Sequence, residues 1–162
     1  NVFNFILFVL FFSYAASVLF IAPNYLSYVS ILGGSHDNTY KILVGSNIDQ
    51  GQDLLELKRY MQENNISKIK LSYWGSVDPK DYGINFDYLP SPYFQPWQNN
   101  YTHIVTTPKK IGEDCSDKKG LIAISVTNLQ NVHLINKTCY NWLKNHVSIE
   151  KIGHSIFIYD IK

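Results

Sequence analysis

The chain has 162 residues, with 14 Lys+Arg against 13 Asp+Glu and a formal net charge of +1. Beyond an apolar start, about 140 residues remain, which suits one domain that can fold without covalent cross-links. The near-neutral balance excludes nucleic acid as an expected partner, because phosphate binding needs a basic surplus on one face.

The chain begins with its longest apolar stretch, residues 2–22 (VFNFILFVLFFSYAASVLFIA), and residues 1–36 carry no Asp, Glu, Lys or Arg. A helix over this stretch rises roughly 30 Å, the thickness of the bilayer hydrocarbon core. Pro23 then ends it. We expect a transmembrane helix. Two alternatives stay open: a signal peptide, although a charged start is missing, and a buried soluble helix, although it would be apolar on every face.

The first half of the remaining chain predicts a strand, a helix and a strand. The apolar run 41–45 (KILVG) is bounded by turn residues and predicts a strand. Residues 49–65 predict a helix, with Asp49 as N-cap, Gln52 at N3 and an apolar stripe at helical spacing. The alternation in 68–74 (KIKLSYW) predicts the second strand, so we expect a right-handed βαβ unit.

The second half predicts shorter elements. In chain order these are a capped helical turn over 78–82, an ordered aromatic loop over 87–101, a strand over 103–107, a charged turn over 112–120, a strand over 121–127, a short helix over 138–146 and a central strand over 155–161. The expected fold is therefore α/β: a transmembrane helix over 1–22, a juxtamembrane segment over 23–40, and a small α/β domain over 41–162 with a mixed, mainly parallel sheet.

The two cysteines, Cys115 and Cys139, fit no metal motif, because no further Cys or His stands at ligand spacing. In an extracytoplasmic domain they can form one disulfide that closes a loop of roughly 25 residues. Two unrelated reduced thiols are the alternative. The histidines form no H-x-x-x-H pair either, so no metal and no cofactor is expected in this chain.

Polar side chains gather after the first predicted strand, where open α/β sheets place their ligands. Amide, hydroxyl and carboxylate groups in this pattern suit the hydroxyls of a sugar. The aromatic residues Tyr73 and Tyr82 follow the second predicted strand and can add a sugar-binding face. The alternative is that these residues are only caps, turn residues and core. The candidate contacts are Ser46, Asn47, Asp49, Gln52, Asp53, Tyr73 and Tyr82; none is expected to be catalytic.

Several strings appear in a fixed order: YVSILGG at 28–34, SNIDQGQDL at 46–54, LSYWG at 71–75, AISVTNL at 123–129 and IGHSIFIY at 152–159. This order resembles the C-terminal part of membrane glycosyltransferases similar to dolichyl-phosphate-mannose protein mannosyltransferases and aminoarabinose transferases. In those proteins the pattern is SNLDWGQDL, LSYFG, AISATNL and IGYSIFVY. One departure is Gln50, where the family pattern usually has Trp.

The resemblance implies a multi-pass enzyme of the cell membrane that moves a sugar from a polyprenyl-phosphate carrier to an extracytoplasmic acceptor. The catalytic acidic residue is then expected in an early outer loop, upstream of residue 1. This chain is expected to supply an accessory domain that binds the acceptor or covers the active site. Its partners are then the lipid bilayer, upstream transmembrane helices, and a glycan or lipid-linked sugar. The alternative is a non-enzymatic, membrane-tethered glycan-binding or assembly domain.

Overall fold

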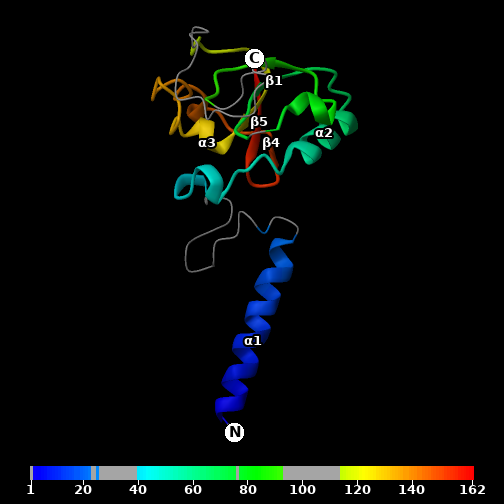
Figure 1. Cartoon of the computed structure of the whole chain (residues 1–162), viewed down its shortest axis with the longest axis vertical. Helices are drawn as coiled ribbons and strands as arrows, with labels where there is room; N and C mark the ends of the chain where they lie inside the picture. Colours follow the sequence, from blue (N-terminus) through cyan, green and yellow to red (C-terminus); the bar gives the residue numbers. More distant parts are fainter. Residues whose placement is uncertain (1, 23–24, 26–39, 76, 93–113) are drawn as a thin grey trace.

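The computed structural model describes residues 2–22, 25, 40–75, 77–92 and 114–162 of the chain. It has one apolar helix and one five-stranded sheet with helical segments, so the predicted α/β class is confirmed (Figure 1). With 3-10 helices labelled η, the elements are α1 (Val2–Ile21), η4 (Gly45–Asn47), α2 (Leu54–Glu63), β1 (Ile69–Ser72), η5 (Pro79–Tyr82), β2 (Phe86–Tyr88), β3 (Gly120–Ser125), α3 (Val126–Leu129), η6 (Leu143–Asn145), β4 (Glu150–Ile152) and β5 (Ile156–Ile161).

Helix α1 is uncharged over its 20 residues and exposes large apolar side chains, such as Leu10 and Phe20. Its two serines are satisfied within the helix, because the hydroxyls of Ser13 and Ser17 donate to the carbonyls of Leu10 and Tyr14 at 2.9 and 2.7 Å. By length and composition the stretch Val2–Phe20 is able to cross a bilayer.

The sheet has the strand order β2-β1-β3-β5-β4. Strand β1 runs parallel to β2 and β3, whereas β5 runs antiparallel to β3 and β4. The sheet is therefore mixed, as predicted, but it is not mainly parallel. The difference arises at Gly153, where a left-handed φ of +54° turns β4 directly back into β5.

The predicted strand over 41–45 is wrong, and with it the expected βαβ unit. This segment does not pair with the sheet; Ile42 is exposed, and Gly45 has a left-handed φ of +63°. The helix begins at Leu54 instead of Asp49, so Asp49 is not its N-cap. Gly51 lies in the predicted first turn with a φ of +81°, which right-handed helix cannot accommodate.

Later in the chain, the strands predicted over 68–74, 121–127 and 155–161 are confirmed as β1, β3 and β5, although β3 ends at Ser125. The capped turn over 78–82 is also confirmed, since the Asp78 carboxylate accepts from the Lys80 amide at 2.9 Å.

The helix over 138–146 is wrong: only Leu143–Asn145 forms a 3-10 turn. The aromatic loop was predicted from residue 87, but Phe86–Tyr88 is strand β2; the rest of that loop beyond residue 92 and the predicted strand 103–107 lie outside the described residues.

The sheet carries an apolar core on each face. On one face, Leu54, Leu57 and Met61 of α2 pack against β1 and against Ile156 and Ile158 of β5. The opposite core joins alternate residues of β3 and β5 to the segment between α3 and β4; it contains Ile122, Ile124, Leu129, Leu134, Cys139, Tyr140, Leu143, Phe157 and Tyr159. Strand β5 is therefore apolar on both faces, as expected for a central strand.

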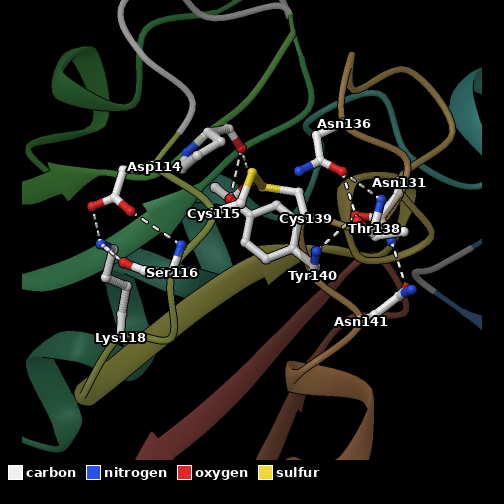
Figure 2. The surroundings of a disulfide bond; sticks show 12 residues. Asp114, Cys115, Ser116, Lys118, Asn131, Asn136, Thr138, Cys139, Tyr140 and Asn141 are labelled. Carbon is white, nitrogen blue, oxygen red and sulfur yellow. Dashed lines mark hydrogen bonds and ion pairs between the residues drawn. A yellow bond between two sulfur atoms is a disulfide. The ribbon is translucent and has the colours of Figure 1, made fainter.

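A disulfide joins Cys115, just before β3, to Cys139, in the segment that covers the second core. Figure 2 shows the two sides of this bond. On the Cys115 side, Lys118 pairs with the Asp114 carboxylate. On the Cys139 side, the Asn131 side chain accepts from the Tyr140 amide at 2.8 Å. The disulfide thus fixes a segment without regular secondary structure against the sheet.

Candidate functional site

Four of the strings in the sequence meet at one end of the sheet. Strands β1 and β3 end here at Ser72 and Ser125, and the turn between β4 and β5 lies here as well. The loop 43–53 crosses this end before α2 begins. We call the segments 43–53, 73–75, 125–135 and 153–155, together with Val77, the motif end of the domain. In Figure 1 it lies opposite the C-terminus, which β5 reaches at the other end of the sheet.

Asp53 joins the loop to the β4–β5 turn. Its side chain is 4% exposed, and its Oδ2 accepts from the Ser155 amide at 3.1 Å and from the Ser155 hydroxyl at 2.6 Å. A Cβ on Gly153 would lie 2.3 Å from this carboxylate, so only glycine fits beneath it. These hydrogen bonds engage the carboxylate and hold the two segments together.

Asp49 is fully buried beside Asp53. One carboxylate oxygen, Oδ1, accepts from the Gly51 amide at 3.1 Å, whereas Oδ2 has no hydrogen-bond partner among the described residues. Burial raises the pKa of Asp49 to about 7, and the negative charge of Asp53 adds to the rise. The Gly51 amide and the hydroxyls of Ser125 and Ser155 oppose it. The carboxyl group therefore titrates near neutral pH.

Tyr73 completes the buried set. Its side chain is 1% exposed. A Cβ added to Gly51 would lie 1.8 Å from the Tyr73 hydroxyl, and a Cβ added to Gly75 would lie 2.0 Å from it. Both glycines are required by this approach. The hydroxyl has no hydrogen-bond partner among the described residues. Burial raises the pKa of Tyr73 above its ordinary value, and the charge of Asp49 raises it further.

The other predicted contacts lie on the surface. Ser46 and Asn47 in η4 are exposed, as are Gln52 and Tyr82. Gln52 is partly engaged: its Oε1 accepts from the Gln50 amide at 2.8 Å, and its Nε2 donates to the Ile48 carbonyl at 3.1 Å. The structure thus divides the predicted set into a buried group that joins segments and an exposed group that faces outward.

Two buried hydroxyls at the motif end were missed by the sequence analysis as site residues. The Ser125 hydroxyl accepts from the Trp74 amide at 2.9 Å, and the Thr127 hydroxyl accepts from the Gly45 amide at the same distance. Both residues stand in the AISVTNL string, which was the signal that could have identified them. They attach the start of the loop and the end of β1 to α3.

Asn128 in α3 forms a second polar network. It is 1% exposed, and its Nδ2 donates to the hydroxyls of Ser72 at 2.9 Å and Ser91 at 3.2 Å. The Ser72 hydroxyl in turn donates to the Pro90 carbonyl at 2.8 Å. This network fixes the chain that leaves β2 next to the end of β1.

An aromatic pair lies next to these networks. The rings of Trp74 and His133 stack with centroids 4.3 Å apart and planes inclined by 21°. Trp74 is 7% exposed, whereas His133 is exposed. Burial lowers the pKa of His133, and the nearby charge of Lys137 lowers it further. At neutral pH the His133 imidazole that stacks on the Trp74 indole is therefore mainly in its neutral form.

Chemically, the exposed part of the motif end offers hydroxyl and amide groups next to aromatic surface. Such groups bind hydroxyl-rich ligands by hydrogen bonds and stacking. Within the described ranges, no group of three or more His, Cys, Asp or Glu side chains is arranged to hold a metal ion.

Comparisons of the chain with models of protein families, with curated proteins and with solved structures found no match.

Proposed function

We propose that this chain is the membrane-anchored C-terminal part of a multi-pass glycosyltransferase that takes its sugar from a polyprenyl-phosphate carrier. In this account α1 spans the cell membrane and the α/β domain stands on the extracytoplasmic side. The domain is accessory: it binds the acceptor or covers the active site. The observation that carries the proposal is the meeting of SNIDQGQDL, LSYWG, AISVTNL and IGHSIFIY at one end of one sheet.

The contacts at this end give a physical reason for the residues that the chain shares with the family pattern. Gly51 and Gly75 leave the room that the Tyr73 hydroxyl occupies. Asp53 and Ser155 bind each other across the molecule. These residues are distributed over three of the strings, and each has a role that few other residue types can fill. Shared residues that contact and require one another in this way support common descent over chance similarity.

The disulfide and α1 support the proposed location. Disulfides persist in oxidising compartments outside the cytoplasm, and Cys115 is joined to Cys139 here. An uncharged helix of 20 residues with exposed apolar side chains is stable in the hydrocarbon core of a bilayer.

Within the domain, the exposed polar residues are the proposed acceptor contacts, namely Ser46, Asn47 and Gln52, with Tyr82 second. The buried Asp49, Asp53 and Tyr73 then act indirectly, because they fix the loop that carries those side chains. A non-enzymatic, membrane-tethered glycan-binding domain would use the same exposed groups but would transfer no sugar.

A transfer assay on the complete gene product tests the proposal. Membranes that contain it are supplied with a radiolabelled polyprenyl-phosphate sugar, and label in the acceptor fraction is measured. We expect transfer, and we expect Asn47→Ala with Gln52→Ala to raise the KM for acceptor while Gln62→Ala, on the exposed side of α2, leaves it unchanged. Absence of transfer by the folded, disulfide-bonded protein would contradict the enzyme and favour the non-enzymatic alternative.

A further inference from the structure

Large apolar side chains stand exposed around the motif end. Ile42 precedes the loop, Leu55 lies in the first turn of α2, Val77 follows Gly75, and two more lie after α3. We call this set the apolar rim; its members and their exposed fractions are Ile42 (68%), Leu55 (58%), Val77 (41%), Val132 (37%) and Ile135 (65%). Contacts already described hold each of these segments at this end: Gly45 to Thr127, Asp53 to Ser155, and Trp74 on His133.

From this arrangement we propose that the apolar rim rests on the surface of the lipid bilayer, with the motif end facing the membrane. The proposal depends on the membrane anchor of the proposed function, but not on sugar transfer. Apolar side chains that surround one end of a domain mark an interaction surface, and the headgroup–acyl boundary of a bilayer receives such side chains.

The point at which the chain enters the domain favours the bilayer as the occupant. The described domain starts at Tyr40, two residues before Ile42, whereas the C-terminus leaves β5 at the opposite end. The connection from α1 over residues 22–39 therefore attaches to the motif end. With α1 as the anchor, the motif end is therefore the end of the domain to which the membrane helix is joined along the chain.

The distribution of charge points the same way. Charged residues are frequent at the end opposite the motif end, where α2 stops and where β1, β3 and β4 begin: Glu63, Lys68, Asp114, Asp117, Lys118, Lys119 and Glu150. At the motif end the exposed charged residues are fewer: Lys41, Glu56 and Lys137. Lys41 adjoins Ile42, with its ammonium over the Tyr40 ring, and Lys137 donates to the carbonyl of Val132 in the rim. Both ammonium groups thus lie at the rim, where lipid phosphates are suitable counter-ions.

A photocrosslinking experiment on the full chain tests this orientation. The photoreactive amino acid p-benzoylphenylalanine replaces Ile135 or Leu55, and the protein is placed in nanodiscs of phosphatidylethanolamine and phosphatidylglycerol. Val147 is the matched control, because it is 89% exposed and precedes β4 near the opposite end; Phe8 in α1 is the control for insertion. After illumination, lipid adducts are quantified by mass spectrometry, and an intact disulfide verifies the fold of each variant.

We expect lipid adducts at Phe8, Ile135 and Leu55, at least fivefold above those at Val147. Adducts at Phe8 with none at either rim position, or equal adducts at Val147, would overturn the proposed orientation while leaving the anchor in place. Crosslinks from the rim to a second copy of the chain would also overturn it. Loss of adducts at Phe8 would reject the anchor and the orientation together.

Discussion

The carboxylate of Asp53 accepts two hydrogen bonds from Ser155, which lies 102 residues further along the chain. One comes from the amide and one from the hydroxyl, at 3.1 and 2.6 Å, and both residues are buried. This pair connects the loop before α2 to the turn between β4 and β5. It is the direct physical link between the first and the last strings of the motif end.

Asp53→Ala should lower the free energy of unfolding by about 2–3 kcal/mol, because it leaves a buried amide and a buried hydroxyl without their charged acceptor. The measurement is denaturant unfolding of the full chain in detergent, followed by tryptophan fluorescence. Asp160→Ala, an exposed carboxylate in β5, is the control and should change stability by less than about 0.5 kcal/mol. Equal losses in the two variants would contradict the pairing.

Tyr73→Phe should be neutral or slightly stabilising, since the buried hydroxyl that it removes has no hydrogen-bond partner among the described residues. Tyr140→Phe is the matched comparison, because the Tyr140 hydroxyl donates to the Pro90 carbonyl at 2.6 Å. It should cost about 1 kcal/mol in the same unfolding measurement. A larger loss for Tyr73→Phe than for Tyr140→Phe would mean that the Tyr73 hydroxyl is bound in the folded protein.

Asp49 should make the domain less stable as pH rises. Its pKa is about 7 in the folded protein against an ordinary value of 3.8, so the folded state retains the proton through this interval while the unfolded state loses it. The resulting loss in the free energy of unfolding is at most roughly 4 kcal/mol. This loss is absent below pH 3.8 and complete above pH 7.

Asp49→Asn keeps an oxygen for the Gly51 amide and removes the titration. We expect it to match the wild type in thermal unfolding near pH 4.5 and to exceed it by several degrees at pH 8. The expectation fails if the variant shows the same difference from the wild type at both pH values, because the effect would then be independent of ionisation.

The disulfide should contribute about 3 kcal/mol to the free energy of unfolding, as expected for a loop that spans a sequence separation of 24. Replacing both Cys115 and Cys139 with Ser should therefore lower the melting temperature of the domain by several degrees. Reduction of the wild type with dithiothreitol should reproduce the shift, and the doubly substituted chain should be insensitive to it. An unchanged melting temperature on reduction would contradict a structural role for the bond.

The sequence predicted the elements whose burial pattern is simple. The stripe of Leu54, Leu57 and Met61 identified α2, alternation identified β1, and a run that is apolar on both faces identified β5. Strands β2 and β4 were missed because each has three residues and includes exposed charges, as short edge strands often do. The run 41–45 was wrongly predicted as a strand for the opposite reason: it is apolar, but Ile42 remains exposed and does not enter the sheet.

The candidate site was predictable in place but not in detail. Polar residues after β1 and before α2 do meet at one end of the sheet. Their division into buried and exposed groups depends on contacts over long sequence separations, such as Asp53 with Ser155 and Gly45 with Thr127. Periodicity carries no information about such pairs. Gly51 was the available sequence signal, because a glycine within a predicted first turn argues against helix there.

Both proposals depend on α1 spanning the membrane, and alkaline carbonate extraction tests this most directly. Membranes that contain the chain are treated at pH 11, and the pellet and supernatant are examined by intact-mass spectrometry. We predict that the chain stays in the pellet with residues 2–22 still attached. Recovery in the supernatant, either intact or shortened by removal of α1, would contradict the account.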